Sequence, residues 1–125
     1  MKTLIFLAML TFIAACYSST NNAYGQVVNE KVDKTEFSKL MKKPGSQLID
    51  VRTSREFASG FIAGAKNIDY NGDSFDKQIK KLDKNKPVLV YCAAGGRSEN
   101  AAELLKEWGF KEVYDLIGGY NDWKE

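Results

Sequence analysis

The residues best suited to carry chemistry in this sequence surround Cys92. An apolar run at 88–91 precedes the cysteine, four small residues follow it at 93–96, and an amphipathic segment begins near Ser98. Small residues let backbone N–H groups turn toward a sulfur atom, and a helix that begins after them points the positive end of its dipole at the same place. Both effects favour a thiolate, so we predict that Cys92 has a lowered pKa and is a nucleophile.

The alternative interpretation of Cys92 is an unreactive core residue, because free cysteine is among the most buried residue types. The Gly-Gly pair, the adjacent Arg97 and the helix start favour a functional site instead. Four residues separate Cys92 from Arg97. A cysteine phosphatase loop needs one residue more to surround a phosphoryl group, so this spacing suits the transfer of a single sulfur atom better.

Three segments together resemble a known family. The sequence Cys-Ala-Ala-Gly-Gly-Arg-Ser at 92–98 resembles the active loop of the rhodanese-like sulfurtransferases, residues 50–68 are similar to the first signature of that family, and residues 116–123 to its closing Gly-Gly and tryptophan. The resemblance covers about residues 30–125. The family usually has His-Ile-Pro-Gly where this chain has Phe-Ile-Ala-Gly at 61–64, and the chain contains no histidine. Since the family's sulfur chemistry is carried by the cysteine and the loop amides, we expect this difference to alter local packing more than catalysis.

The resemblance implies an enzyme that moves sulfane sulfur from an anionic donor such as thiosulfate to a thiol or other nucleophile. Cys92 would attack the outer sulfur of the donor, hold that sulfur as a persulfide and pass it on. No cofactor is needed for this chemistry. The expected substrate-binding residues are the small loop, its arginine and the serine that follows: Ala93, Ala94, Gly95, Gly96, Arg97 and Ser98.

Three charged residues have a structural interpretation beside the functional one. Arg97 should bind the anionic donor or leaving group, and its alternative is an ordinary ion pair with a nearby carboxylate. Asp50 and Arg52 are expected to support the loop geometry from the end of a strand, and a purely structural ion pair is at least as good an interpretation. The closing residues Gly118, Gly119 and Trp123 are interpreted as packing residues.

Composition limits the other options. The chain has 125 residues, 44% of them hydrophobic, which suits one globular domain with a tail. Its 18 basic and 16 acidic side chains are interleaved, so we expect no nucleic-acid partner. The absence of histidine makes a metal site improbable. We expect a monomer whose partners are the small sulfur donor and a thiol or protein acceptor.

The N-terminal segment predicts export. The apolar run at 4–15 is too short to span a bilayer and suits the core of a signal peptide. Ile-Ala-Ala-Cys at 13–16 resembles the bacterial lipobox, so we expect Cys16 to be lipidated and to become the new N-terminus. Alternatives are cleavage before Gln26, which would release a soluble secreted form, and an uncleaved anchor. The mass of the mature N-terminus would distinguish them.

The predicted organisation follows from these segments. Residues 1–25 would form the signal peptide and a polar tether, and residues 27–125 the folded domain, placed in the periplasm or anchored by lipid to a membrane of a bacterial cell envelope. Strands and helices alternate in the domain, which predicts an α/β three-layer sandwich with a central, mainly parallel sheet. Expected strands are at 48–51, 66–68, 87–91 and 112–115. Expected helices follow the caps Asp33 and Thr53, each with a glutamate three residues on (Glu36 and Glu56), and lie at 74–82, at 98–108 and after Gly118.

Two other classes of function stay open at this point. A phosphatase or arsenate reductase relative would share the cysteine and arginine, but the loop lacks one residue and no general acid is recognisable. A non-catalytic envelope module that carries sulfur or binds a partner would also keep Cys92 and Arg97. Turnover with a small thiol acceptor would separate a carrier from a catalyst.

Overall fold

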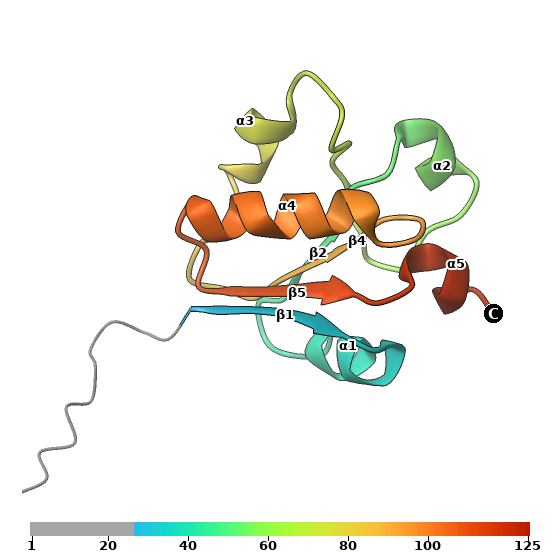
Figure 1. Cartoon of the computed structure of the whole chain (residues 1–125), viewed down its shortest axis with the longest axis horizontal. Coiled ribbons are helices and arrows are strands. Elements are labelled where there is room, and N and C mark those ends of the chain that lie inside the picture. Colours follow the sequence, from blue (N-terminus) through green and yellow to red (C-terminus); the bar gives the residue numbers. More distant parts are fainter. Residues whose placement is uncertain (1–26) are drawn as a thin grey trace, which may run out of the picture.

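The computed structural model describes residues 27–125 (Figure 1). The predicted signal peptide, the tether and Cys16 lie outside the described residues, so export stays a prediction. Within 27–125, no helix is both long and apolar enough to cross a membrane. The elements in chain order are β1 (Val28–Val32), α1 (Lys34–Leu40), β2 (Gln47–Asp50), α2 (Ser54–Ala58), β3 (Lys66–Asn67), α3 (Phe75–Ile79), β4 (Val88–Tyr91), α4 (Gly96–Glu107), β5 (Glu112–Leu116) and α5 (Gly119–Trp123).

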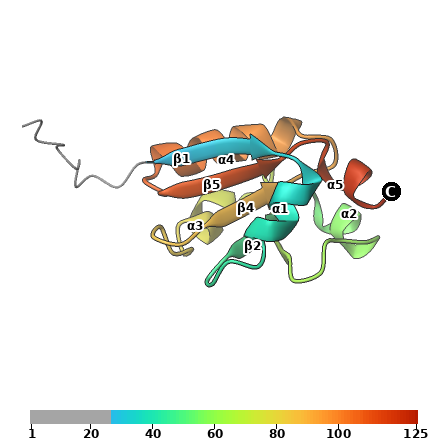
Figure 2. The same ribbon diagram turned by 90° about the horizontal axis from the view of Figure 1, so that it is seen from below.

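The five strands form one parallel sheet in the order β1-β5-β4-β2-β3. Figure 2 shows β1, β5 and β4 side by side, with α1 in front of the sheet. Helices cover both faces, as parallel strands require. The predicted α/β sandwich with a central parallel sheet is confirmed, and β4, which leads to Cys92, is its central strand.

Side chains alternate between the two faces of the sheet along β4, and this alternation determines the face on which Cys92 lies. Val88, Val90 and Cys92 belong to the core on the side of α3 and α4. Leu89 and Tyr91 belong to the core on the side of α1 and α5. Successive strand residues point to opposite faces of a sheet. Cys92 therefore emerges on the α4 face, directly below the start of that helix.

The structure differs from the prediction in two elements. Strand β1 was not predicted, because its sequence Val-Asn-Glu-Lys-Val is mostly polar and half exposed; pairing with β5 in register from Val28 to Val32 makes it an edge strand. The helix expected at 74–82 is confined to Phe75–Ile79. Its last residues form tight turns instead, with Leu82 N–H bound to the Ile79 carbonyl.

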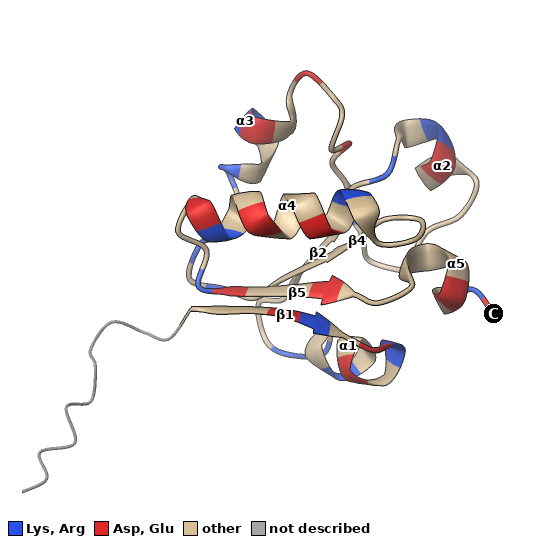
Figure 3. Ribbon diagram, in the orientation of Figure 1, with Lys and Arg blue, Asp and Glu red and all other residues tan. Residues whose placement is uncertain are grey.

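Charged residues show no single-sign surface in the described part of the chain. Figure 3 shows basic and acidic positions mixed over α1, α2, α3 and α4. This distribution agrees with the interleaving of basic and acidic residues in the sequence.

The closing Gly-Gly pair connects the last helix to the cysteine loop. Gly119 has a left-handed backbone (φ +59°), and a Cβ added to it would lie 2.5 Å from the Cys92 carbonyl oxygen and 2.6 Å from that of Ala93. The backbone N–H groups of Tyr120 and Asn121 donate to these same two carbonyls, at 2.8 and 3.0 Å. The start of α5 thus holds the loop from behind, and only glycine permits so close an approach.

The steric role of Gly119 predicts a large effect of its replacement. Gly119→Ala should lower the free energy of unfolding by about 2 kcal/mol or more, since it adds a backbone clash to left-handed strain. Gly109→Ala is the matched control: Gly109 also has positive φ (+87°), but nothing lies within 4 Å of an added Cβ, so about 1 kcal/mol is expected. Denaturant unfolding measures both, and equal losses would contradict the proposed contact.

Candidate active site

The sulfur of Cys92 lies inside a short loop between β4 and α4. Its Sγ accepts a hydrogen bond from the Gly95 N–H at 2.9 Å, and the Ser98 hydroxyl lies 3.4 Å away. Cys92 itself is only 1% exposed. Gly95 has φ +121° and nothing within 4 Å of an added Cβ, so it is the backbone conformation, not crowding, that favours glycine there.

Burial and hydrogen bonding act on the Cys92 thiol in opposite directions. Burial raises its pKa, because the charged form loses hydration. The Ser98 hydroxyl and the backbone N–H groups of Ser98, Gly95 and Ala94 donate toward the sulfur and lower it, and together they prevail, so the pKa of Cys92 lies below its ordinary value. The pKa of Cys92 is therefore shifted in the predicted direction, by the Ser98 hydroxyl together with the loop amides.

Arg97 is bound by a carboxylate rather than free. Its two terminal nitrogens contact the two oxygens of Glu56 at 2.7 and 3.0 Å. This paired, planar arrangement is the strong geometry for a guanidinium and a carboxylate. The structure therefore contains the ion pair that was the alternative interpretation for Arg97, and the guanidinium remains partly exposed beside the loop.

Glu56 joins the cysteine loop to α2. Its side chain also accepts from the Thr53 N–H, and the Thr53 hydroxyl accepts in turn from the Glu56 N–H, which completes the capping box predicted at the start of α2. The Arg97 guanidinium, above all, and Thr53 lower the pKa of Glu56 from 4.5 to about 2, despite an opposing effect of burial. Sequence reasoning used Glu56 only as a cap, because nothing in local spacing reveals a partner on α4.

Asp50 and Arg52 form a buried ion pair near the other end of the loop. The Arg52 Nη2 lies 2.6 Å from Asp50 Oδ2 and 2.7 Å from the Gly60 carbonyl. The guanidinium also lies 4.3 Å from the ring centre of Tyr120. Since the Tyr120 N–H binds the Cys92 carbonyl, this pair supports the loop through α5, and the guanidinium also lies 5.7 Å from the ring centre of Tyr91. Neither residue contacts Sγ, which agrees with a role in supporting the geometry of the loop.

The segment that departs from the family's usual His-Ile-Pro-Gly is well packed. Phe61 is 47% exposed and stacks on Phe57, with ring centres 4.1 Å apart. Ile62 is buried, and its N–H donates to the Tyr91 hydroxyl at 3.0 Å. The histidine position is thus occupied by an aromatic pair at the surface, away from the sulfur contacts.

A pocket of about 400 Å³ opens beside Ala93 at the rim of the loop. It is lined on one side by Glu56 and Tyr120, and its basic groups are Arg52, Arg55 and Lys124. Arg55 and Lys124 make no ion pair with any described residue. Their charges favour small anions near the entrance to the site.

The groups around Cys92 indicate chemistry at a thiol. Within 27–125, no group of three or more histidine, cysteine, aspartate or glutamate side chains is arranged to hold a metal ion. A thiol of lowered pKa, surrounded by N–H donors, is suited to attack on sulfur and to carrying a further sulfur atom as an anion.

Comparison with known proteins agrees with this geometry. Residues 33–125 match the family described as the Rhodanese-like domain. The chain belongs to the rhodanese-like family. It is 39% identical over 95 residues to the thiosulfate sulfurtransferase GlpE of Coxiella burnetii, a match that covers 76% of this chain and 87% of that protein. It is also 34% identical over 120 residues to the uncharacterized protein YqhL of Bacillus subtilis, covering 96% and 88%.

Solved rhodanese-like structures share the fold. A rhodanese-related protein from Thermoplasma volcanium superposes with a TM-score of 0.67 at 28% identity, covering 76% of this chain and 90% of that one. A rhodanese-like domain protein from Staphylococcus aureus gives 0.66 at 30% identity, covering 75% and 90%. The cysteine loop of this rhodanese-like domain therefore lies in a scaffold common to proteins from distant organisms.

The Glu56–Arg97 pair predicts a specific dependence of stability on pH. Because the pKa of Glu56 falls from 4.5 to about 2 on folding, its contribution is complete above pH 4.5 and is lost as the pH falls through about 2. The wild-type protein should be more stable than Glu56→Gln near neutral pH, and this difference should shrink across that acidic range. Denaturant midpoints at several pH values measure it.

Glu107→Gln is the matched control, since Glu107 is exposed on α4 and makes no ion pair with a described residue. A difference between the wild type and Glu56→Gln that stays constant with pH would contradict the assignment of the ion pair.

Proposed function

We propose that this rhodanese-like protein is a sulfurtransferase that takes sulfane sulfur from an anionic donor such as thiosulfate and passes it to a thiol or another nucleophile. The observation that carries the proposal is the position of Cys92 Sγ, which accepts the Gly95 N–H and lies beside the Ser98 hydroxyl. The name of the GlpE relative adds thiosulfate as a donor of the right chemistry.

The proposed reaction has two balanced steps. The Cys92 thiolate attacks the outer sulfur of thiosulfate, a new S–S bond forms, and the original S–S bond breaks with its electron pair leaving on sulfite. An acceptor nucleophile then attacks the terminal sulfur of the Cys92 persulfide, and the thiolate is the leaving group. No net oxidant or reductant is consumed when cyanide accepts the sulfur as thiocyanate.

The loop would stabilise negative charge on sulfur in both steps. The amides of Ala94, Gly95 and Ser98 already act on the Cys92 sulfur, and we assign them to the persulfide anion as well. The small side chains at Ala93, Ala94, Gly95 and Gly96 leave these donors accessible. A persulfide is larger than a thiolate by one sulfur atom, and we assign the position of that atom to the inside of the loop at 93–97.

Recognition of the donor would not depend on a free Arg97. Since Glu56 holds both ends of that guanidinium, we assign Arg97 to fixing α2 against α4 while adding positive charge beside the loop. Arg55 and Lys124 line the pocket next to Ala93 and are placed to attract an anionic donor or acceptor. In this assignment Arg55 and Lys124 attract the anion, whereas Arg97 maintains the shape of the loop.

Catalytic turnover tests the proposal. The folded domain should form thiocyanate from thiosulfate and cyanide, with parallel double-reciprocal lines, because sulfite leaves before the acceptor enters. Cys92→Ser should lower kcat/KM by at least about a thousandfold. A phosphatase relative would instead hydrolyse a phosphoryl substrate and leave thiosulfate unchanged.

Two results would contradict the proposal. Wild-type turnover equal to that of Cys92→Ser would exclude a persulfide on Cys92. One sulfur transferred per molecule, with no turnover for any thiol or cyanide acceptor, would instead identify a sulfur carrier.

A further inference from the structure

A buried carboxyl group behind the cysteine loop has no place in the proposed reaction. Asp115, on β5, is 3% exposed. Its Oδ1 makes no hydrogen bond to any described residue. A buried polar atom without a partner is costly and rare in folded proteins, so the presence of an aspartate at this position needs an explanation.

The strand register brings Asp115 to the same side of the sheet as Cys92. Asp115 pairs with Val90 on β4, and Val90, Val113 and Cys92 share the core beneath α4. Side chains two residues apart on a strand face the same way. Asp115, two residues after Val113, therefore points toward the first turn of α4, where Ser98 is fully buried.

The Ser98 hydroxyl acts on the pKa values of both the Cys92 thiol and the Asp115 carboxyl group. Its oxygen lies 3.4 Å from Cys92 Sγ and 3.1 Å from the Gly95 carbonyl oxygen. A hydrogen bond from Ser98 also lowers the pKa of Asp115 against the effect of burial. A hydroxyl has one proton to donate, so an ionised Asp115 and the Cys92 thiolate compete for it.

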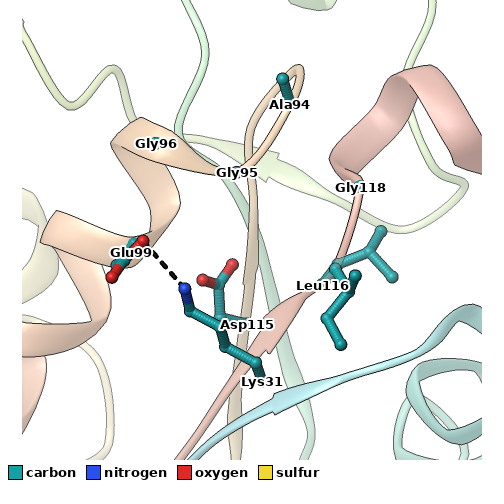
Figure 4. A pocket seen from close by; sticks show the side chains of 9 residues that line it. Lys31, Ala94, Gly95, Gly96, Glu99, Asp115, Leu116 and Gly118 are labelled. Atoms are coloured by element: carbon teal, nitrogen blue, oxygen red, sulfur yellow. Dashed lines mark ion pairs between the residues drawn. The ribbon is translucent and has the colours of Figure 1, made fainter.

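Asp115 is one of the residues that line a pocket beside the cysteine loop. Figure 4 shows Asp115 between Lys31 and Gly95 in a pocket of about 290 Å³ that also touches Ala94 and Gly96. Beside Asp115, the Lys31 ammonium forms an ion pair with Glu99, with 2.9 Å between Nζ and Oε2. The nearest cation is thus paired with a different carboxylate, and Asp115 lies beside the loop without an ion-pair partner among the described residues.

Every charged group that faces Asp115 comes from a neighbouring element. Lys31 lies on β1, Glu99 and Glu103 lie on α4, and Cys92 follows β4. Burial, above all, and Glu99 raise the pKa of Asp115, while Ser98 and Lys31 lower it, and the result is a pKa of about 6. The carboxyl group of Asp115 therefore ionises at a higher pH than an ordinary aspartate does, chiefly because it is buried.

We propose that Asp115 is a positioning residue that controls, through the Ser98 hydroxyl, how strongly the loop stabilises negative charge on Cys92. Neutral Asp115 donates to Ser98 Oγ and leaves the Ser98 proton to the sulfur. Ionised Asp115 accepts the hydrogen bond from the Ser98 hydroxyl, which then no longer donates to the sulfur. The inference rests on the proposed function for the role of the sulfur, but its test needs no sulfur donor.

The test is a titration of the thiolate by its ultraviolet absorbance in the folded protein. Asp115→Asn removes the charge and keeps a donor for Ser98, so the apparent pKa of Cys92 should fall and the thiolate fraction below that pKa should rise roughly threefold. In a Ser98→Ala background the same substitution should have less than about half of this effect. Glu103→Gln, which removes an exposed charge on α4, should leave the titration unchanged.

Three outcomes would overturn the inference: no shift for Asp115→Asn, an undiminished shift in the Ser98→Ala background, or an equal shift for Glu103→Gln. The last two would mean that only charge at a distance acts on the sulfur. If Asp115→Asn fails to fold, Asp115→Leu replaces it, since an apolar side chain suits the buried site; it should also lower the apparent pKa of Cys92. Thiosulfate turnover in the same variants, scored separately, shows whether the proposed function holds.

Discussion

Everything in this structure depends on holding a few backbone N–H groups around one buried sulfur atom. A thiol that is 1% exposed would ordinarily resist ionisation. Here the Gly95 N–H contacts Sγ at 2.9 Å, and the Ser98 hydroxyl and further amides act in the same sense. Because these donors are backbone N–H groups and the side chain of one loop residue, their positions depend on the loop, and the rest of the domain fixes that loop.

Three sets of contacts restrain the loop. Helix α5 binds the Cys92 and Ala93 carbonyls, and Gly119 allows the close approach. Helix α2 is tied to α4 through Glu56 and Arg97. The buried Asp50–Arg52 pair supports α5 through the ring of Tyr120. A central parallel strand thus delivers the sulfur, and contacts that are distant in sequence keep its surroundings in place.

Local signals in the sequence predicted much of this arrangement. The small residues after Cys92 predicted the loop, Thr53 and Glu56 predicted the capping box, and alternating elements predicted the parallel sheet. Three features were not predictable in this way. Edge strand β1 is too polar to show a strand pattern, the partner of Arg97 lies 41 residues away, and the position of Asp115 depends on strand register. All three features depend on contacts between segments that are distant in the sequence, and local sequence patterns do not reveal such contacts.

The central claim is that this loop carries sulfur on Cys92, and the mass of the intact domain tests it most directly. After brief exposure of the reduced domain to thiosulfate, the account predicts a gain of one sulfur atom that is absent in Cys92→Ser and is removed by cyanide or a thiol. A domain whose mass stays unchanged with thiosulfate and with persulfide donors, or one that gains sulfur without Cys92, would contradict the account.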